Sequence, residues 1–411
     1  MEAVQTALIT GLMHHLSGAN CHHHPPALLS PPVPLQIKGY KSWQFIYGST
    51  TTRLRSSMFT GALLHTPIPT VLFGSSSQSP SPPTFSASYS SKLNCNIRLS
   101  MASSVRIVIV GDVHDDWNLE EDSKALELLR PDLVLFTGDF GNENVKLVRS
   151  IAALKMPKAA ILGNHDAWNT QSFSEKGKDA VQLQLESFGE EHVGYQRLDF
   201  HSLKLSVVGG RPFSCGGERL FRKQLLTKRY GVHNMNESAK KICEAAVGTP
   251  KDHSIILLAH NGPTGLGSNM NDICGRDWVR GGGDHGDPDL AVAISQLKGS
   301  GSSSTKYSIP VVVFGHMHKE LAFGNGQRKM IVVGDGDDNT IYLNGAIVPR
   351  VKRFSHNTLR AFTLIDSKQG KLEKITQTWV SVSLTQDTDT TTIEEEHILF
   401  TNNNIPTTSS I

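Results

Sequence analysis

Five short apolar segments of this chain each run into a polar loop that opens with Asp, Asn or His, usually beside Gly. The segments are of strand length and rich in β-branched or aliphatic residues, which is typical of buried strands. They lie at 105–110, 132–136, 158–162, 255–259 and 311–314. Apolar residues at helical spacing separate the first three. This alternation predicts an α/β fold in which crossover helices join parallel strands.

The same pattern continues through one domain, predicted to cover 102–383. Further strands are predicted at 203–208, 330–333, 361–365 and 375–380, and helices at 119–129, 144–154, 171–188, 220–230 and 237–247. A last helix is predicted to begin at Asp287-Pro288, with Asp287 as its cap and Pro288 in its first turn. The sequence shows no internal repeat.

The first 101 residues differ from the rest in composition. Residues 1–100 contain one acidic residue against six basic ones, and ten of the nineteen prolines of the chain. A basic, Ser-rich and acid-poor segment is typical of an organelle transit peptide. Because Ser and Pro outweigh Arg there, a plastid is favoured over a mitochondrion. We therefore expect a leader over 1–101 and a chloroplast location.

Composition also limits what the domain does. No apolar run approaches the ~18 residues that span a bilayer. The five cysteines show no CxxC spacing, so neither a disulfide framework nor a zinc–thiolate site is expected. The chain has a net charge of +2. Residues 1–100 contribute +5, so the rest of the chain carries −3. This modest charge argues against a broad nucleic-acid-binding surface on the domain. Residues 384–411 are rich in Thr and Asn and are predicted to form a mobile polar tail.

The loops after the five strands carry nine candidate site residues. In chain order they are Asp112, His114, Asp139, Asn164, His165, Asp166, His260, His316 and His318. Ligands at the carboxyl ends of sheet strands converge on one edge of an open α/β sheet. Taken singly, Asp112 or Asp166 could cap a helix, and His260 could be a core histidine. Asn164 and Asp139 could be turn residues. Their repetition after five strands favours a shared site.

The residue types indicate metal chemistry. Carboxylate oxygen, amide oxygen and imidazole nitrogen suit ions such as Mn, Fe or Zn. A carboxylate can bridge two ions, and two ions ~3.5–4 Å apart can bind a phosphate and generate a hydroxide nucleophile. The five loops supply enough ligands for two divalent or trivalent ions and leave one His for proton transfer.

The ordered set D-x-H, G-D, G-N-H-D, H and G-H-x-H resembles that of the calcineurin-like metallophosphoesterase superfamily. The resemblance covers roughly residues 105 to 320. It implies a four-layer α/β/β/α sandwich with a mixed double β-sheet and a metal site at the carboxyl ends of the strands. It also implies a phosphoric ester hydrolase, in which a metal-bridging hydroxide attacks phosphorus.

The resemblance further implies a role for each residue. Three would hold the first ion, namely Asp112, His114 and His318. Asp139 would bridge, and the second ion would be held by Asn164, His260 and His316. His165 would be the general acid that protonates the leaving-group oxygen, and Asp166 would orient its ring.

One motif departs from the family pattern. Many members continue the second motif as GDxxDR, whose Arg contacts phosphate, whereas here Asn142 and Glu143 follow Gly138-Asp139-Phe140-Gly141. This disfavours a Ser/Thr protein phosphatase. The candidates for meeting the phosphate charge lie in Gly-rich loops near ligand-bearing strand ends; they are Arg211, Arg276 and Arg280.

The expected activity is therefore hydrolysis of a phosphorylated small molecule, which could be a phosphomonoester, a phosphodiester or a nucleotide. The missing Arg motivates an alternative from another class, a catalytically weak regulatory protein that binds metal or nucleotide on the same fold. His165 favours the enzyme. The sequence does not choose between the substrate types, and it does not indicate an oligomeric state.

Overall fold

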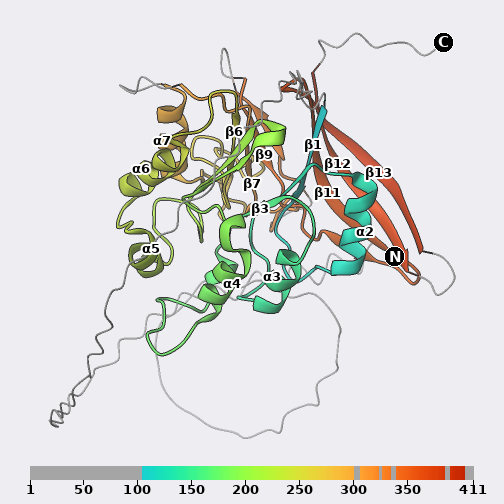
Figure 1. The fold of residues 1–411 in the computed structure, drawn as a ribbon, viewed down its shortest axis with the longest axis horizontal. Helices are drawn as coiled ribbons and strands as arrows, with labels where there is room; N and C mark the ends of the chain where they lie inside the picture. The colour runs from blue at the N-terminus through green and yellow to red at the C-terminus, as the bar shows by residue number, and fades with distance from the viewer. Residues whose placement is uncertain (1–103, 300–305, 324–325, 335–338, 385–388, 403–411) are drawn as a thin grey trace, which may run out of the picture. The chain divides into compact units, whose positions relative to one another are not determined.

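The computed structural model describes residues 104–299, 306–323, 326–334, 339–384 and 389–402. The predicted leader over 1–101 lies outside these residues. The described residues form two β-sheets with helices on both outer sides. Figure 1 shows α2 on one side of the strands, and α6 and α7 on the other.

The first sheet has seven strands in the order β13-β12-β11-β1-β2-β3, with β10 beside β11. Its strands are β1 Ser104–Val110, β2 Leu133–Phe136, β3 Lys158–Ala160, β10 Val351–Arg353, β11 Thr358–Lys368, β12 Lys371–Leu384 and β13 Asp389–Thr401. The neighbours β1, β2 and β3 run parallel. The other neighbouring strands pair antiparallel, which makes this sheet mixed.

The second sheet has six strands in the order β4-β5-β6-β7-β9-β8. Its strands are β4 Arg197–Phe200, β5 Leu205–Gly209, β6 Ser254–Leu258, β7 Val311–Phe314, β8 Ile331–Val333 and β9 Ile341–Asn344. The four central strands are parallel, and β4 and β8 pair antiparallel at the edges. The predicted α/β fold with a mixed double sheet is confirmed.

Side-chain alternation along β1 separates two apolar layers. Ile107 and Ile109 belong to a buried cluster that also contains Val207, Ile256 and other residues of the second sheet. This cluster is the core between the two sheets. The intervening valines of β1 face the other way, toward the helices. A strand covered on both faces reads as a continuous apolar run, and this is why the sequence of β1 does not alternate with polar residues.

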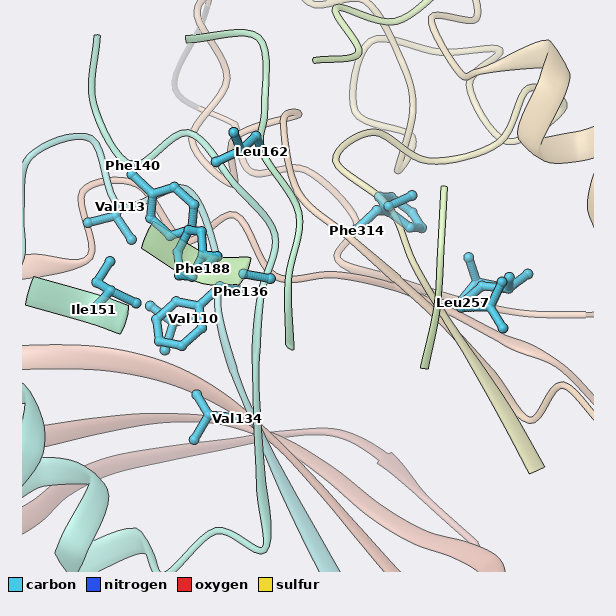
Figure 2. Packing of buried hydrophobic residues seen from close by; sticks show 14 of the residues in the cluster. Val110, Val113, Val134, Phe136, Phe140, Ile151, Leu162, Phe188, Leu257 and Phe314 are labelled. Atoms are coloured by element: carbon cyan, nitrogen blue, oxygen red, sulfur yellow. The ribbon is translucent and has the colours of Figure 1, made fainter. Parts of the chain in front are cut away.

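Six α-helices cover the outer faces in the described residues. They are α2 Leu119–Leu129, α3 Val145–Ala152, α4 Ala180–Phe188, α5 Lys223–Tyr230, α6 Met235–Ala246 and α7 Pro288–Leu297. In Figure 2, Val110 and Phe136 of the first sheet lie beside Ile151 of α3 and Phe188 of α4. The ring of Phe188 also contacts Phe140, at 5.2 Å between centroids, so this layer reaches the loop after β2.

Three local predictions need correction. The helix predicted from 171 begins at Ala180, where Asp179 caps it by accepting the N–H of Gln182. Asp287 does precede α7, but its side chain caps nothing, because its carboxylate is bound elsewhere. The tail predicted from 384 is wrong for Asp389–Thr401, which form the edge strand β13. Thr has a high β-propensity, and here it pairs with β12 rather than forming a tail.

Two expected absences concern the described residues only. None of their helices combines the length and the apolar character that a membrane span requires. The cysteines among them, Cys215, Cys243 and Cys274, are all free thiols.

The buried imidazole of His192 predicts a pH dependence of stability. Its Nε2 accepts the N–H of Leu162 at 3.3 Å, so the ring is neutral in the fold. Burial, with the charge of Arg229, lowers the pKa of His192 to about 3. The unfolded chain binds the proton near pH 6.5 and the folded chain does not, so the free energy of unfolding falls as pH decreases from about 6.5 toward 3.

Replacement of His192 by Gln should remove this contribution. Between about pH 7 and about pH 5, the wild-type chain should lose about 2 kcal/mol more of its free energy of unfolding than His192→Gln, measured by urea denaturation. The exposed His356 gives a matched control, because His356→Gln should keep the wild-type dependence. Equal losses in wild type and His192→Gln would contradict the assignment.

Candidate metal centre

The five predicted loops meet at one edge of the structure. The loops after β1 and β2 are joined by the N–H of His114, which donates to the carbonyl of Asp139 at 2.8 Å. Those after β6 and β7 are joined by the N–H of Gly315, which donates to the carbonyl of His260 at 2.8 Å. His316 joins the loops of the two sheets, because its N–H donates to a carboxylate oxygen of Asp112 at 2.9 Å.

One group of potential ligands contains Asp112, His114 and His318. The two imidazole nitrogens, Nε2 of His114 and Nε2 of His318, are 3.0 Å apart. The carboxylate of Asp112 is buried, and its Oδ2 lies 3.6 Å from Nε2 of His318. These three side chains come from the loops after β1 and β7, which belong to different sheets, so only the stacking of the sheets brings them together.

A second group contains Asp139, His260 and His316. Asn164 belongs with it, since its Oδ1 is 2.9 Å from Nε2 of His260. Nδ1 of His260 is 2.7 Å from the carbonyl of Thr137, to which it donates. That bond fixes the tautomer and leaves Nε2 as the atom that faces the site.

The carboxylate of Asp139 lies between the two groups. Its Oδ2 is 3.9 Å from Nε2 of His114, and its Oδ1 is 3.4 Å from Nε2 of His260. Burial alone would raise the pKa of Asp139, but His260 and the neighbouring histidines hold it well below its usual range. Burial likewise would lower the pKa of His260, and the Asp139 carboxylate raises it to about 10. The Asp139 carboxylate and the His260 imidazole therefore stabilise each other's charged forms.

The backbone at this edge is strained. Four candidate ligands have positive φ although none is glycine: Asp112 at 40°, His114 at 43°, Asp139 at 51° and His316 at 65°. Non-glycine residues adopt this region at an energetic cost and cluster there at functional sites. The loops have therefore been fixed in conformations that aim these side chains inward.

Glycines in the loops leave room for the ligands. A Cβ atom on Gly163 would lie 2.3 Å from Oδ1 of Asp139 and 2.5 Å from the His260 ring. A Cβ atom on Gly315 would lie 2.1 Å from Oδ1 of Asp112. At both positions the structure requires glycine, because any side chain would collide with a candidate ligand.

The donor set fits metal cations. Two nitrogens that bind one ion at ~2.1 Å, at an angle near that of octahedral or tetrahedral geometry, lie ~3.0–3.4 Å apart, which agrees with the spacing of His114 and His318. The field of Asp139 that holds a proton on His260 would equally hold a cation. Carboxylate, amide and imidazole ligands suit borderline ions.

His165 lies beside both groups. Its ring is 5.0 Å from the ring of His114, and its N–H donates to Oδ1 of Asp139 at 2.9 Å. Nδ1 of His165 is 2.6 Å from Oδ1 of Asn142. An amide oxygen only accepts, so Nδ1 carries a proton and its orientation is fixed by Asn142.

A sequence profile of the calcineurin-like phosphoesterase family matches residues 105–320. This range contains all five loops and more than half of the chain. The chain belongs to the calcineurin-like phosphoesterase family. It is therefore a metal-dependent phosphoesterase, and membership of this family implies a phosphorylated substrate. No curated protein sequence matches the chain significantly.

Three solved structures are similar to parts of this chain. A dimetal phosphatase from Danio rerio is 11% identical with a TM-score of 0.39, and the match covers 66% of this chain and 95% of that one. PhoD is 8% identical with a TM-score of 0.38, over 72% of this chain and 69% of that one. A predicted phosphoesterase from Streptococcus pneumoniae is 9% identical with a TM-score of 0.25, over 71% and 98%.

Asp166 does not have the contacts predicted for it. Its carboxylate accepts three backbone N–H groups, from Asp139 at 2.9 Å, Phe140 at 2.9 Å and Gly163 at 2.8 Å. The residue that orients the ring of His165 is Asn142. Asp166 instead binds the loop after β2 to the loop after β3, and so sets the distance between Asp139 and the His165 turn.

Glu143 holds the segment that follows His165 through main-chain hydrogen bonds. Its carboxylate accepts the N–H groups of Asn169 at 2.7 Å and Thr170 at 2.6 Å. It thereby holds the segment that follows the 3-10 helix His165–Ala167. The two positions that depart from the GDxxDR pattern thus both support the His165 segment, and neither supplies a positive charge.

Arg211 is not available to bind phosphate. Only 2% of the residue is exposed, and its guanidinium pairs with Asp287 at 2.7 Å and Asp289 at 2.9 Å. Burial would lower the pKa of Arg211, and these two carboxylates raise it above its ordinary value. The ion pairs join the loop after β5 to the start of α7. The phosphate-binding prediction for Arg211 is therefore wrong.

The other two arginines have different surroundings. Arg276 is half-buried, and a Cβ atom on Gly283 would lie 2.3 Å from one of its terminal guanidinium nitrogens. Arg276 thus packs on the backbone of its own Gly-rich loop. Arg280 is exposed. The structure places neither of them in contact with the two ligand groups, and a phosphate-binding role for them stays a prediction.

Three residues near the site escaped the sequence-based reasoning. Thr137 contacts both ligand groups: its hydroxyl donates to Oδ1 of Asp112 at 3.2 Å, and its carbonyl accepts from Nδ1 of His260 at 2.7 Å. Trp168 stacks on His165, at 4.8 Å between ring centroids. His285 stacks on His316 at 6.1 Å. Only Trp168 had a usable signal, because it stands three residues after His165, one turn along a helical segment.

The buried ion pairs predict that Arg211 matters for stability rather than for phosphate binding. Arg211→Ala leaves two buried carboxylates without their cation, so the free energy of unfolding should fall by about 3–5 kcal/mol. The exposed Arg280 is the matched control, and Arg280→Ala should change it by less than about 0.5 kcal/mol. Urea denaturation measures both. An Arg211→Ala protein with wild-type stability and a raised KM would reverse the conclusion.

Proposed function

We propose that this phosphoesterase holds two metal ions and hydrolyses the ester of a phosphorylated small molecule, either a monoester, a diester or a nucleotide. One observation carries the proposal. The carboxylate of Asp139 has one oxygen toward His114 and the other toward His260, which places it between two separate ligand groups. A single carboxylate shared in this way suits a pair of ions better than a single one.

The residues divide between the two positions. Asp112, His114 and His318 would hold one ion, and Asn164, His260 and His316 the other, with Asp139 common to both. The donor types favour Mn, Fe or Zn. When bound, such a pair lowers the pKa of water and neutralises charge on the phosphoryl group.

His165 is the proposed general acid. Asn142 holds its Nδ1, so the proton to be transferred is the one on Nε2. Water adds to phosphorus, the bond from phosphorus to the ester oxygen breaks, and that oxygen takes the proton of His165. The products are an alcohol and a phosphate, and a proton from water restores His165. The stacked ring of Trp168 keeps the imidazole from rotating away.

The composition of residues 1–101 supports a location for this reaction. The segment is basic and Ser-rich and has one acidic residue, which is the composition of a transit peptide. We therefore place the phosphoesterase in the plastid. A fluorescent fusion of the full chain, compared with a fusion of 102–411, tests this location.

The bridging role of Asp139 predicts a loss of both metal and activity. Asp139→Asn should bind one ion or fewer per chain, against two in wild type, as measured by elemental analysis of the dialysed protein. Hydrolysis of 4-nitrophenyl phosphate or its diester should fall by at least about 100-fold, because outer residues of metal sites alone cost up to that much.

Asp366 supplies the matched control for this experiment. It pairs with Arg106 on the outer part of β1, at 2.7 Å, so Asp366→Asn should leave metal content and activity unchanged. An Asp139→Asn protein that keeps two ions and full activity would refute the bridging role. A wild-type chain that binds two ions and hydrolyses none of the monoesters, diesters and pyrophosphates in a panel would instead support the regulatory alternative.

The general-acid role of His165 predicts a dependence on the leaving group. His165→Asn should slow hydrolysis of alkyl phosphate esters by about 10²–10⁴-fold, because an alkoxide needs the proton to depart. Hydrolysis of the 4-nitrophenyl ester should fall much less, since nitrophenolate departs as an anion. Metal content should not change, and the exposed His356→Asn should behave as wild type. Equal losses for both esters would exclude the role.

A further inference from the structure

A continuous run of rings leads outward from the ligand groups. The ring of His114 is 5.0 Å from that of His165, which is 4.8 Å from Trp168, which in turn is 6.2 Å from Phe221. The guanidinium of Arg222 lies 4.4 Å from the centre of the Phe221 ring. The run begins at a candidate ligand and passes through the proposed general acid, so its outer part lies on the leaving-group side.

The outer rings are held by backbone contacts. His165–Ala167 form a 3-10 helix, and the N–H of Trp168 donates to the carbonyl of His165 at 3.2 Å, which brings the two rings together. They stack at an interplanar angle of 8°. Nε of Arg222 donates to the carbonyl of Ala167 at 2.6 Å, and its Nη2 donates to that of Trp168. The surface is therefore preorganised, and binding to it costs little ordering entropy.

Trp168 is nevertheless exposed. The residue keeps 37% of its surface in contact with solvent, although it directly adjoins the buried His165 segment. One face of the indole is sufficient to hold the imidazole. Phe221 is only partly buried, and it packs against the core on its other side. A large, rigid aromatic surface beside a general acid, with a guanidinium at its end, has the composition of a stacking site for a flat ring.

We propose that Trp168 and Phe221 form a subsite for the leaving group, and that it takes a flat heteroaromatic ring such as a nucleobase. This inference rests on the proposed function, because His165 marks where the leaving-group oxygen lies. The group attached to that oxygen extends past the imidazole, and Trp168 is the side chain stacked on it. The substrate class is therefore a phosphoric ester of a nucleoside, in preference to one of an unsubstituted sugar or alkyl alcohol.

A matched pair of substrates tests the subsite. In adenosine 5′-monophosphate and ribose 5-phosphate the leaving-group oxygen is the same primary alcohol oxygen of a ribose, and only the first compound carries a base. The methyl diesters of the two compounds make a second pair. Base stacking on one aromatic side chain corresponds to about 5- to 150-fold. Wild type should therefore prefer the adenosine ester by at least about tenfold in kcat/KM.

Substitutions at Trp168 separate stacking from positioning. Trp168→Ala should remove most of the preference, with a larger loss in kcat/KM for the adenosine ester than for the ribose ester. Trp168→Phe should retain most of it. The exposed Phe354, on a different part of the surface, is the control, and Phe354→Ala should keep the wild-type preference. If both esters fell by the same factor in Trp168→Ala, or if wild type showed no preference, the subsite would be refuted.

Binding distinguishes this inference from the proposed function. Adenosine 5′-monophosphate should quench tryptophan fluorescence in wild type, and Trp168→Ala should bind it at least about fivefold more weakly. If the chain hydrolysed no ester yet showed this difference, the proposed function would fail and the subsite would stand. If it hydrolysed 4-nitrophenyl phosphate but bound adenosine and ribose phosphates equally, the subsite alone would fail.

Discussion

The carboxylate of Asp166 is the contact on which the site geometry depends. By accepting N–H groups from Asp139, Phe140 and Gly163, it ties the loop after β2 to the loop after β3 in buried surroundings. Burial and the neighbouring Asp139 charge raise the pKa of the Asp166 carboxyl, so the three main-chain donors are what hold it in this position. The position of Asp139 between the ligand groups follows from this tie. A loss of Asp166 would leave three buried donors without acceptors.

Around this tie, the backbone of the ligand loops is strained. The positive φ angles of Asp112, His114, Asp139 and His316 are held by bonds between loops, such as that from the N–H of His316 to Asp112. Such conformations persist only where the surroundings over-determine them. The two sheets supply those surroundings, because each ligand group draws on loops from both. Metal affinity in this phosphoesterase is thus linked to the packing of its inter-sheet core.

The departure from GDxxDR illustrates a different use of the same positions. Asn142 orients His165, and Glu143 holds the segment that carries Trp168. An arginine at 143 would place a cation where the structure has two N–H donors to satisfy. Positions 142 and 143 therefore provide no positive charge for a phosphate. They help to fix the segment that carries the Trp168 ring, and Arg222 donates to the carbonyls of Ala167 and Trp168 in the same segment.

The sequence alone determined the strands that carry the site, the order of the polar loops along the chain and the types of ligand residue. Buried strands and polar strand ends are local patterns, so they can be recognised without the fold. It could also predict convergence at one edge, because parallel strands share a direction. Only the tertiary structure decided which side chains meet. Arg211 looked free in the sequence and lies in a buried ion pair, and Asp166 bonds to backbone rather than to His165. Both outcomes depend on partners from distant loops, and the packing of the two sheets sets those distances.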